Sequence, residues 1–286
     1  MTRIVCLNGE FVPEDEARIP IMDRGLLFAD AVYEGMGVLD GGIVDVRKHL
    51  ARLRRSLAEV GIPEPHTEEE FLGILMELVR RNDVDEGFLY LHVTRGVAER
   101  NYVPVAGLTP TVFGFTQPLQ GASADVEPTG LTMSSQPDLR WARRDVKTTN
   151  LLGQVLANWG ASEAGADEAL LVAPDGTVTE GGAVSFFPVV GGALLVRPLS
   201  NDILPGVTRS TLLEVLEAEG IPIDERTYTL DEALAADEAM ITGASSYVEP
   251  IVAIDGQAIG AGEPGALTLH LRTAYLALVR SRLHPD

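Results

Sequence analysis

The chain has 286 residues, enough for one large or two modest domains with a sizeable core. Hydrophobic residues make up 45% and charged residues 22%, as in ordinary soluble globular proteins, and 22 basic against 42 acidic side chains give a net charge of −20. This charge argues against binding to nucleic acid or to an anionic membrane surface, since both attract basic residues. One cysteine, Cys6, excludes a disulfide framework, and the five histidines lack metal-ligand spacing. Without a long apolar run or a signal-peptide pattern, we expect a cytoplasmic protein with no metal site.

The first 116 residues mix strand and helix patterns. The Asn8-Gly9 dipeptide interrupts the first strand pattern as a turn would. Apolar residues spaced by three and four predict two helices, the first of which ends at Gly61. The predicted strands cover residues 4–12, 32–38, 43–46, 88–94 and 111–116, and the predicted helices cover residues 50–60 and 68–82.

A change of composition divides the chain near its middle. Residues 117–128 are short of large apolar side chains, which predicts a linker between a domain of residues 1–116 and a larger domain of residues 129–286. Strands and helices in mixed order, with many hairpin signals, indicate two α+β domains. In the second domain we predict strands over residues 131–134, 169–172, 185–190 and 193–196, and helices over residues 149–164, 209–219 and 266–283.

Lysine is rare in this chain. Only Lys48 and Lys147 are lysine among the 22 basic residues, and the other 20 are arginine. Codon bias explains the excess of arginine, and the retained lysines can then mark positions where arginine cannot substitute. A Schiff base is such a case, because it needs a primary amine that can lose its proton. Lys147 lies near a predicted helix start, where the macrodipole favours the neutral amine; the alternative is an ordinary surface lysine.

Three further features have both a structural and a functional interpretation. Residues 203–209 lead into a helix, whose backbone N–H groups and Thr208 hydroxyl either bind a phosphate or form a simple N-cap. Glu180 is either a solvated turn residue or a carboxylate facing a heterocyclic nitrogen. Arg52 belongs to a basic cluster over residues 47–55 that either pairs with acids or supplies one phosphate ligand. Neither a Walker nor a Rossmann glycine pattern occurs.

Five stretches, in this order, resemble the class IV aminotransferases, which bind pyridoxal phosphate. They are DRGLLFADAVYE (23–34), HLARL (49–53), DVKTTNLL (145–152), TEG (179–181) and LPGVTR (204–209). The resemblance covers nearly the whole chain, and residues 94–101 and 147–152 resemble the D-amino-acid aminotransferase branch. It implies an α+β, two-domain fold-type IV enzyme with a smaller N-terminal α/β domain and a larger C-terminal domain that carries Lys147.

The resemblance also implies roles for cofactor-binding residues. Lys147 would hold pyridoxal 5′-phosphate as a Schiff base and then move the proton between the substrate Cα and the cofactor. Glu180 would keep the pyridine nitrogen protonated, so that the ring acts as an electron sink. The phosphate would be bound by Arg52, Val207, Thr208 and Ser245.

The substrate carboxylate site departs from the family pattern. D-amino-acid aminotransferases hold this carboxylate with a tyrosine, an arginine and a histidine. Tyr33 and Arg100 match the first two, and Tyr102 stands where the histidine is expected. The altered set implies a reshaped site and broad specificity that could extend to (R)-amines. Ala244 likewise stands where the family often has threonine.

The implied reaction is ping-pong transfer of an amino group from a D-amino acid to a 2-oxo acid such as 2-oxoglutarate or pyruvate. The resemblance also implies a homodimer whose active sites lie near the subunit interface. Alternatives within the family are a branched-chain L-amino-acid aminotransferase, an (R)-amine transaminase and an aminodeoxychorismate lyase. A non-catalytic pyridoxal phosphate-binding protein is the alternative from a different class.

Overall fold

The computed structural model describes residues 2–119 and 123–283, which form two compact units. The first unit contains residues 2–119 and Val146–Asn150, and the second contains residues 123–145 and 151–283. The family resemblance implies that the larger C-terminal domain carries Lys147, whereas the contacts of Val146–Asn150 assign this lysine to the first unit. The predicted linker, residues 117–128, overlaps a strand that continues through Pro118, and its residues 120–122 lie outside the described residues.

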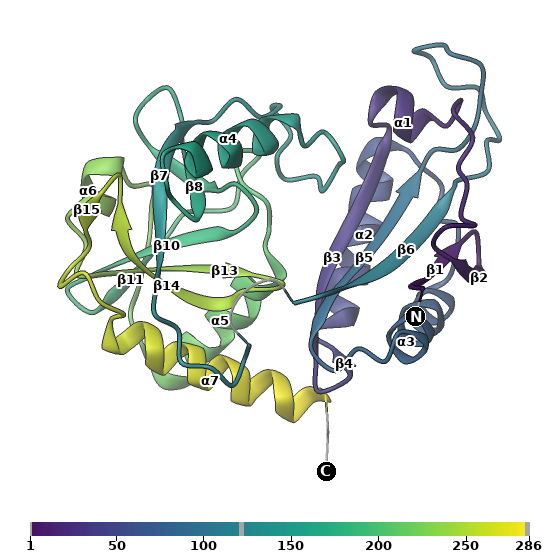
Figure 1. Cartoon of the computed structure of the whole chain (residues 1–286). Coiled ribbons are helices and arrows are strands. Elements are labelled where there is room, and N and C mark those ends of the chain that lie inside the picture. The colour runs from purple at the N-terminus through teal and green to yellow at the C-terminus, as the bar shows by residue number, and fades with distance from the viewer. Residues whose placement is uncertain (1, 120–122, 284–286) are drawn as a thin grey trace. The chain divides into compact units, whose positions relative to one another are not determined.

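A six-stranded sheet in the order β2-β1-β6-β5-β3-β4 forms the framework of the first unit (Figure 1). Its strands are β1 (Ile4–Leu7), β2 (Glu10–Pro13), β3 (Ala31–Leu39), β4 (Gly42–Ile43), β5 (Gly87–Thr94) and β6 (Val112–Pro118). The helices are α1 (Arg24–Phe28), α2 (Val46–Val60) and α3 (Glu68–Arg81). Since α2 packs on β3 and α3 packs on β1 and β6, the two long helices cover the sheet and enclose one hydrophobic core.

Local sequence explains the helix α3 well. Thr67 and Glu70 form a capping box at its start, which satisfies two backbone N–H groups that have no partner inside the helix. Phe71, Leu75 and Leu78 lie on one face and are buried in the core, as their spacing predicts. The neighbouring helix α2 begins at Val46, and of the strand predicted over residues 43–46 only Ile43 lies in a strand, β4.

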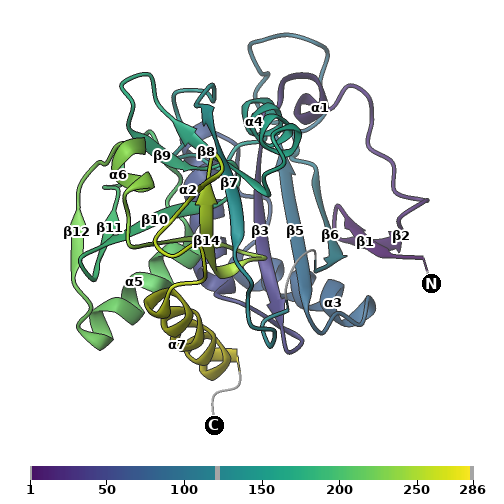
Figure 2. The ribbon, with the colours of Figure 1, turned by 60° about the vertical axis from the view of Figure 1, so that its left-hand side comes forward.

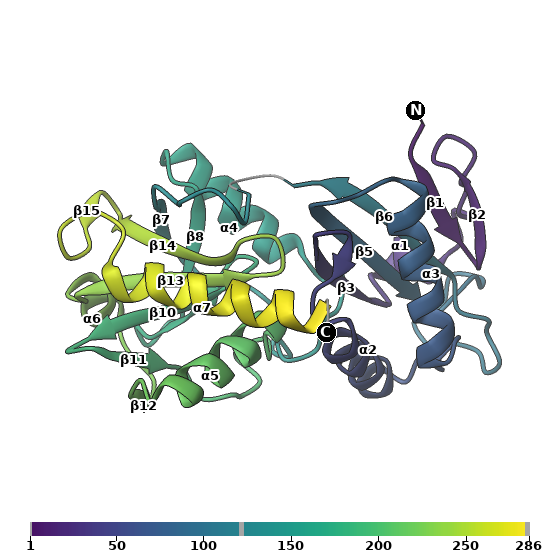
Figure 3. The same cartoon turned by 90° about the horizontal axis from the view of Figure 1, so that it is seen from below.

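The second unit contains a nine-stranded sheet in the order β12-β11-β10-β13-β14-β7-β8-β9, with β15 paired to β14 (Figure 2). Its strands are β7 (Leu131–Pro137), β8 (Glu168–Val172), β9 (Val178–Gly181), β10 (Ser185–Val190), β11 (Ala193–Val196), β12 (Ile223–Glu225), β13 (Glu238–Gly243), β14 (Tyr247–Ile254) and β15 (Gln257–Ala258). Its helices are α4 (Leu152–Glu163), α5 (Val207–Glu219), α6 (Leu230–Leu234) and α7 (Ala266–Leu283). Helix α4 packs on β7 and β8, and α5 and α7 lie side by side against β13 (Figure 3).

The predicted elements of the second domain are present with shifted ends. The prediction for residues 266–283 matches α7, whereas α5 begins two residues earlier than predicted and α4 begins at Leu152 instead of residue 149. The elements α1, α6, β9 and β12 to β15 are not predicted from the sequence. The observed mixture of helices and strands agrees with the predicted α+β class. No helix among residues 2–119 and 123–283 is long and apolar enough to cross a membrane.

Candidate active site

The segment that carries Lys147 is fixed to the first unit by its backbone. The Tyr33 amide donates a hydrogen bond of 3.0 Å to the Lys147 carbonyl, and the Thr149 amide donates one of 3.2 Å to the Ala31 carbonyl. On the other side, the Lys147 amide donates to the Ser56 hydroxyl of α2 at 3.3 Å. The lysine is therefore held between the start of β3 and the middle of α2.

The side chain of Lys147 lies over an aromatic ring. Its Nζ is 4.2 Å from the centroid of the Tyr33 ring, so these two predicted site residues lie together. Tyr33 in turn stacks on Tyr90 at 5.4 Å between centroids, which limits the positions that its ring can take. Because α4 begins only at Leu152, Lys147 lies outside the first turn of that helix. The predicted helix start at residue 149 is therefore wrong, whereas an effect of the helix macrodipole on the Lys147 amine stays a prediction.

Arg52 belongs to a buried cluster with two neighbours. Its Nε and Nη2 atoms donate to the two carboxylate oxygens of Glu34 at 2.9 and 2.7 Å, and His49 Nδ1 lies 2.7 Å from Glu34 Oε2. Burial raises the pKa of Glu34, but the charge and hydrogen bonds of Arg52 outweigh it and lower the pKa to about 2. Burial also lowers the pKa of His49, against the opposing effect of Glu34. The carboxylate is thus ionised at neutral pH and fixes the guanidinium of Arg52.

Arg100 and Tyr102 lie on the segment of residues 97–110, between β5 and β6, which we call the arm. Both side chains are exposed, Tyr102 to 77%. The Arg100 guanidinium carbon lies 5.4 Å from the ring centroid of Tyr102 and 5.4 Å from that of Phe28 in α1. The arm therefore presents a cation and a phenol together, whereas Tyr33 contacts Lys147.

Glu180 is buried in the second unit, within β9, and is not a solvated turn residue. It forms an ion pair with Arg140, and the Leu204 amide donates to both of its carboxylate oxygens at 3.2 Å. Burial raises the pKa of Glu180, although the charge of Arg140 opposes this change. A second positive partner, for example a protonated heterocyclic nitrogen, would stabilise the ionised form of this carboxylate.

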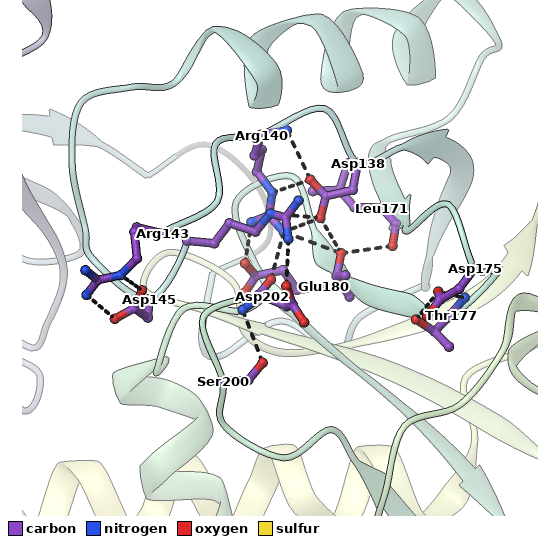
Figure 4. Close-up of polar contacts among 12 residues, drawn as sticks. Asp138, Arg140, Arg143, Asp145, Leu171, Asp175, Thr177, Glu180, Ser200 and Asp202 are labelled. Atoms are coloured by element: carbon purple, nitrogen blue, oxygen red, sulfur yellow. Dashed lines mark hydrogen bonds and ion pairs between the residues drawn. The ribbon is translucent and has the colours of Figure 1, made fainter.

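A network of polar side chains holds Arg140 in place (Figure 4). Asp138 accepts from Arg140 Nε at 2.9 Å and from Nη2 at 2.7 Å, and it also accepts from the Thr179 hydroxyl at 2.8 Å. Although burial raises the pKa of Asp138, Arg140 lowers it below the ordinary value. Asp138 and Arg140, which the sequence analysis did not select, thereby fix the position of Glu180.

The start of α5 has the features of an anion-binding site. The first N–H groups of a helix have no partner inside it, and the N-cap residue, Gly206, has no side chain to offer. Val207 and Thr208, the first two helical residues, are buried. A Cβ on Gly206 would lie 2.9 Å from Ser185 Oγ, so the helix start lies against β10.

Two buried hydroxyls in the same region have no hydrogen-bond partner among the described residues. They are Thr242 Oγ1, at the end of β13, and Ser246 Oγ, in the turn that follows. Thr242 is paired with Ser185 across the sheet, and such partners point to the same side. Unpaired buried hydroxyls cost free energy, so their presence beside a helix start fits a phosphate with several acceptor oxygens.

Ser245, the predicted phosphate ligand of this turn, is half-buried between Ala244 and Ser246. The orphaned hydroxyl belongs instead to its neighbour, Ser246. The turn ends at Tyr247, a buried residue with φ of +55°. The sequence shows the polar residues of this turn. It does not show that β13 pairs with β10, and this pairing determines which of the hydroxyls lies near the start of α5.

The structure therefore groups the predicted residues in two sets. Lys147, Tyr33, Arg52, Arg100 and Tyr102 belong to the first unit. The second unit carries Glu180, Val207, Thr208 and Ser245. Within the part of the chain that the structure describes, no cluster of histidine, cysteine, aspartate or glutamate could hold a metal ion. The predicted residues thus supply an amine on Lys147, a buried carboxylate on Glu180 and an anion-binding helix start at α5.

Comparison with known proteins agrees with this chemistry. The family model of the class IV amino-transferases matches residues 31–254. A D-alanine aminotransferase of Bacillus licheniformis is 40% identical over 94% of this chain and 95% of its own length, and one of Staphylococcus haemolyticus is 35% identical over 99% of both. A crystal structure of the branched-chain amino acid aminotransferase from Thermobaculum terrenum in its holo form has a TM-score of 0.86 at 26% identity, and covers 98% of this chain and 95% of its own.

The chain belongs to the class IV aminotransferases. The predictions of the family, of its fold and of an enzyme that transfers amino groups are confirmed. The D-alanine aminotransferases among its relatives agree with the predicted D-amino-acid branch.

Proposed function

We propose that this chain is a pyridoxal 5′-phosphate-dependent transaminase that moves the amino group of a D-amino acid, such as D-alanine, to a 2-oxo acid. The observation that supports it best is the state of Lys147. Its amine is fixed over the Tyr33 ring and forms no ion pair with an acid among the described residues, so it is available for condensation with an aldehyde. Because 2-oxo acids are intermediates of central metabolism, we also propose a cytoplasmic location.

When bound, the cofactor supplies an aldehyde that takes the amino group and a ring that accepts electron density. Lys147 Nζ would hold that aldehyde in the resting enzyme and, once released by the substrate, would move the proton between the substrate Cα and the cofactor. Glu180, through its buried carboxylate, would keep the pyridine nitrogen protonated. Arg52 would contribute to binding the phosphate, and so would the start of α5 with Thr208.

We propose that the arm binds the substrate carboxylate. The forked guanidinium of Arg100 suits a carboxylate, and the Tyr102 hydroxyl adds one donor. Tyr33 faces Lys147 and orients the substrate from the other side. Tyr102 stands where the family has a histidine, so the arm offers a phenol hydroxyl in place of an imidazole. We therefore include (R)-amines, which have no carboxylate, in the proposed substrate range.

We further propose that the enzyme is a homodimer. Helix α4 has no charged residue before Glu163 and exposes four large apolar side chains to between 48% and 70%: Leu152, Val155, Leu156 and Trp159. Two copies with a charge of −20 each meet most favourably at an uncharged apolar face. In light scattering, Trp159→Glu should reduce the mass toward one chain, while Leu199→Glu, at another exposed leucine, should leave two chains. An unchanged mass for Trp159→Glu would contradict this interface.

A panel of amino donors tests the substrate assignment. D-alanine, L-leucine and (R)-1-phenylethylamine are offered separately with 2-oxoglutarate, and formation of glutamate and of each oxo product is measured. We expect D-alanine to react, so that glutamate forms from 2-oxoglutarate. Reaction of L-leucine alone would favour the branched-chain aminotransferase, whose fold this chain shares with a TM-score of 0.86. Binding of the cofactor without reaction of any donor would favour a non-catalytic protein.

The chain offers its own control for the role of Lys147, because Lys48 is the only other lysine. Lys147→Ala should abolish turnover but retain part of the cofactor affinity through the phosphate contacts. Lys48→Ala should leave turnover close to that of the wild type. Borohydride treatment of the holoenzyme followed by peptide mapping should place the reduced adduct on Lys147. An adduct on Lys48, or full turnover of Lys147→Ala, would overturn the mechanism.

A further inference from the structure

The motif Asp23-Arg24-Gly25 has no role in the chemistry described above, yet its contacts converge on the arm. We propose that Arg24 is a positioning residue, which fixes the arm so that Arg100 and Tyr102 can bind the substrate carboxylate. This inference rests on the proposed function, since that function assigns the carboxylate to these two residues.

Asp23 joins the two chain segments that enter and leave the arm. One of its carboxylate oxygens accepts hydrogen bonds from the Thr94 hydroxyl at 3.1 Å and from the Thr111 hydroxyl at 2.7 Å. Its other oxygen accepts from the Gly25 amide at 2.8 Å and so caps α1. Asp23 is fully buried, so one carboxylate fixes the base of the arm to the start of α1.

The base of the arm is closed tightly at Gly96. The Arg24 amide donates to the Gly96 carbonyl at 3.0 Å. Gly96 has φ of +105°, and a Cβ there would lie 2.0 Å from the Thr109 carbonyl oxygen on the returning segment. A side chain has no room between the two segments, which explains why glycine occupies this position.

The side chain of Arg24 holds the backbone next to the substrate-binding residues themselves. It is buried, with 4% exposed, and its Nε donates to Asp30 at 2.8 Å. Nη1 donates to the Asn101 carbonyl at 2.5 Å, and Nη2 donates to the Tyr102 carbonyl at 3.2 Å. The planar fork of a guanidinium can serve three such acceptors at once, whereas a lysine ammonium lacks this fixed geometry.

An aromatic ring links Arg24 to Arg100. The guanidinium carbon of Arg24 lies 4.8 Å from the centroid of the Phe28 ring, and that of Arg100 lies 5.4 Å from the same ring. Tyr102 packs on Phe28 at 5.5 Å between centroids. Arg100 and Tyr102 are exposed, and exposed side chains on an irregular segment are mobile unless their backbone is held. Arg24 supplies that restraint.

Arg95 provides a matched control. It also forms an ion pair with Asp30, through Nε at 2.8 Å and Nη2 at 2.9 Å. Its remaining contacts go to the carbonyls of Val60 and Gly61 at the end of α2, and not to the arm. Removing either arginine therefore takes a charged partner from Asp30, but only the loss of Arg24 releases the carbonyls of the arm.

The experiment compares Arg24→Gln, Arg24→Lys and Arg95→Gln as holoenzymes. We expect the KM for D-alanine to rise about 10- to 100-fold in both Arg24 variants, with kcat and the cofactor absorbance close to those of the wild type. Arg95→Gln should keep its KM within about threefold. Hydrogen exchange measured by mass spectrometry should accelerate in peptides from residues 97–110 in the Arg24 variants alone.

The outcomes separate this inference from the proposed function. Wild-type enzyme that transfers no amino group from D-alanine refutes the proposed function, and the exchange of the arm peptides then decides the role of Arg24. Active wild type with an unchanged KM in Arg24→Lys, or arm exchange equal in all variants, overturns the inference. An equal loss in Arg24→Gln and Arg95→Gln also overturns it, because the arm contacts then have no specific role.

Discussion

The substitution Glu34→Gln tests how much the buried cluster around Arg52 contributes to stability. Glu34 is fully buried, and although burial raises its pKa, Arg52 and His49 together lower the pKa from 4.5 to about 2. A lowering of this size corresponds to about 3 kcal/mol in favour of the folded state. Because the folded-state pKa is the lower one, this contribution is complete above pH 4.5 and is lost as the pH falls toward 2. The neutral amide introduced by the substitution would also leave the guanidinium of Arg52 without a buried counter-charge.

Urea unfolding followed by circular dichroism measures the effect. At pH 7 we expect the midpoint of Glu34→Gln to lie about 1 M or more below that of the wild type, with a difference that narrows as the pH falls below 4. Glu77 is the control, because Arg80 and Arg81 lower its pKa to about 2 at a solvent-accessible position. Glu77→Gln should hardly move the midpoint. Equal midpoints for Glu34→Gln and the wild type at pH 7, or a difference independent of pH, would refute the reasoning.

Three further outcomes follow from local geometry. Glu180→Gln should lower kcat by about 100-fold or more in steady-state assays, because an amide cannot hold the proton on the pyridine nitrogen; a loss below about tenfold would contradict this role. Gly260→Ala should lower the free energy of unfolding by about 3 kcal/mol, because the new Cβ would lie 2.1 Å from the Asp237 carbonyl oxygen. Gly256 also has a positive φ but has open space around it, so Gly256→Ala should lower the free energy of unfolding by only about 1 kcal/mol. Thr67→Ala should cost about 1 kcal/mol through the lost cap of α3, and an unchanged midpoint in urea would be inconsistent with it.

Elements with strong local signals were predictable from the sequence. The capping box at Thr67 and the apolar spacing from Phe71 define α3 almost to the residue, and α7 has the predicted bounds. The short helix α1 was missed, because five residues cannot form a stable helix alone and α1 depends on contacts with Thr94. Strands β13 and β14 pair with each other as a hairpin, but their other partners, β10 and β7, are distant in sequence, and local patterns do not reveal that pairing.

The candidate site was predictable in its residue types but not in its supporting contacts. The scarcity of lysine and the family motifs selected Lys147, and the TEG motif selected Glu180. Arg140, which pairs with Glu180, is 40 residues away from it in the sequence, and no local pattern reveals such a pair. The helix start at Leu152 also could not be read from apolar periodicity alone, so the start predicted at residue 149 was wrong.

Three buried arginines have a clear physical role in this structure. Each set of functional side chains depends on a buried guanidinium that binds several acceptors with fixed geometry: Arg52 on Glu34, Arg140 on Asp138 and Glu180, and Arg24 on Asp30 and two carbonyls of the arm. Buried ion pairs add little net stability compared with apolar packing, but removing one partner is costly, so they define positions more than they strengthen the fold. Lys147 differs because its amine must lose a proton to form a bond, which a guanidinium does not do at physiological pH. These three arginines thus fix positions, whereas Lys147 supplies an amine that can form a covalent bond.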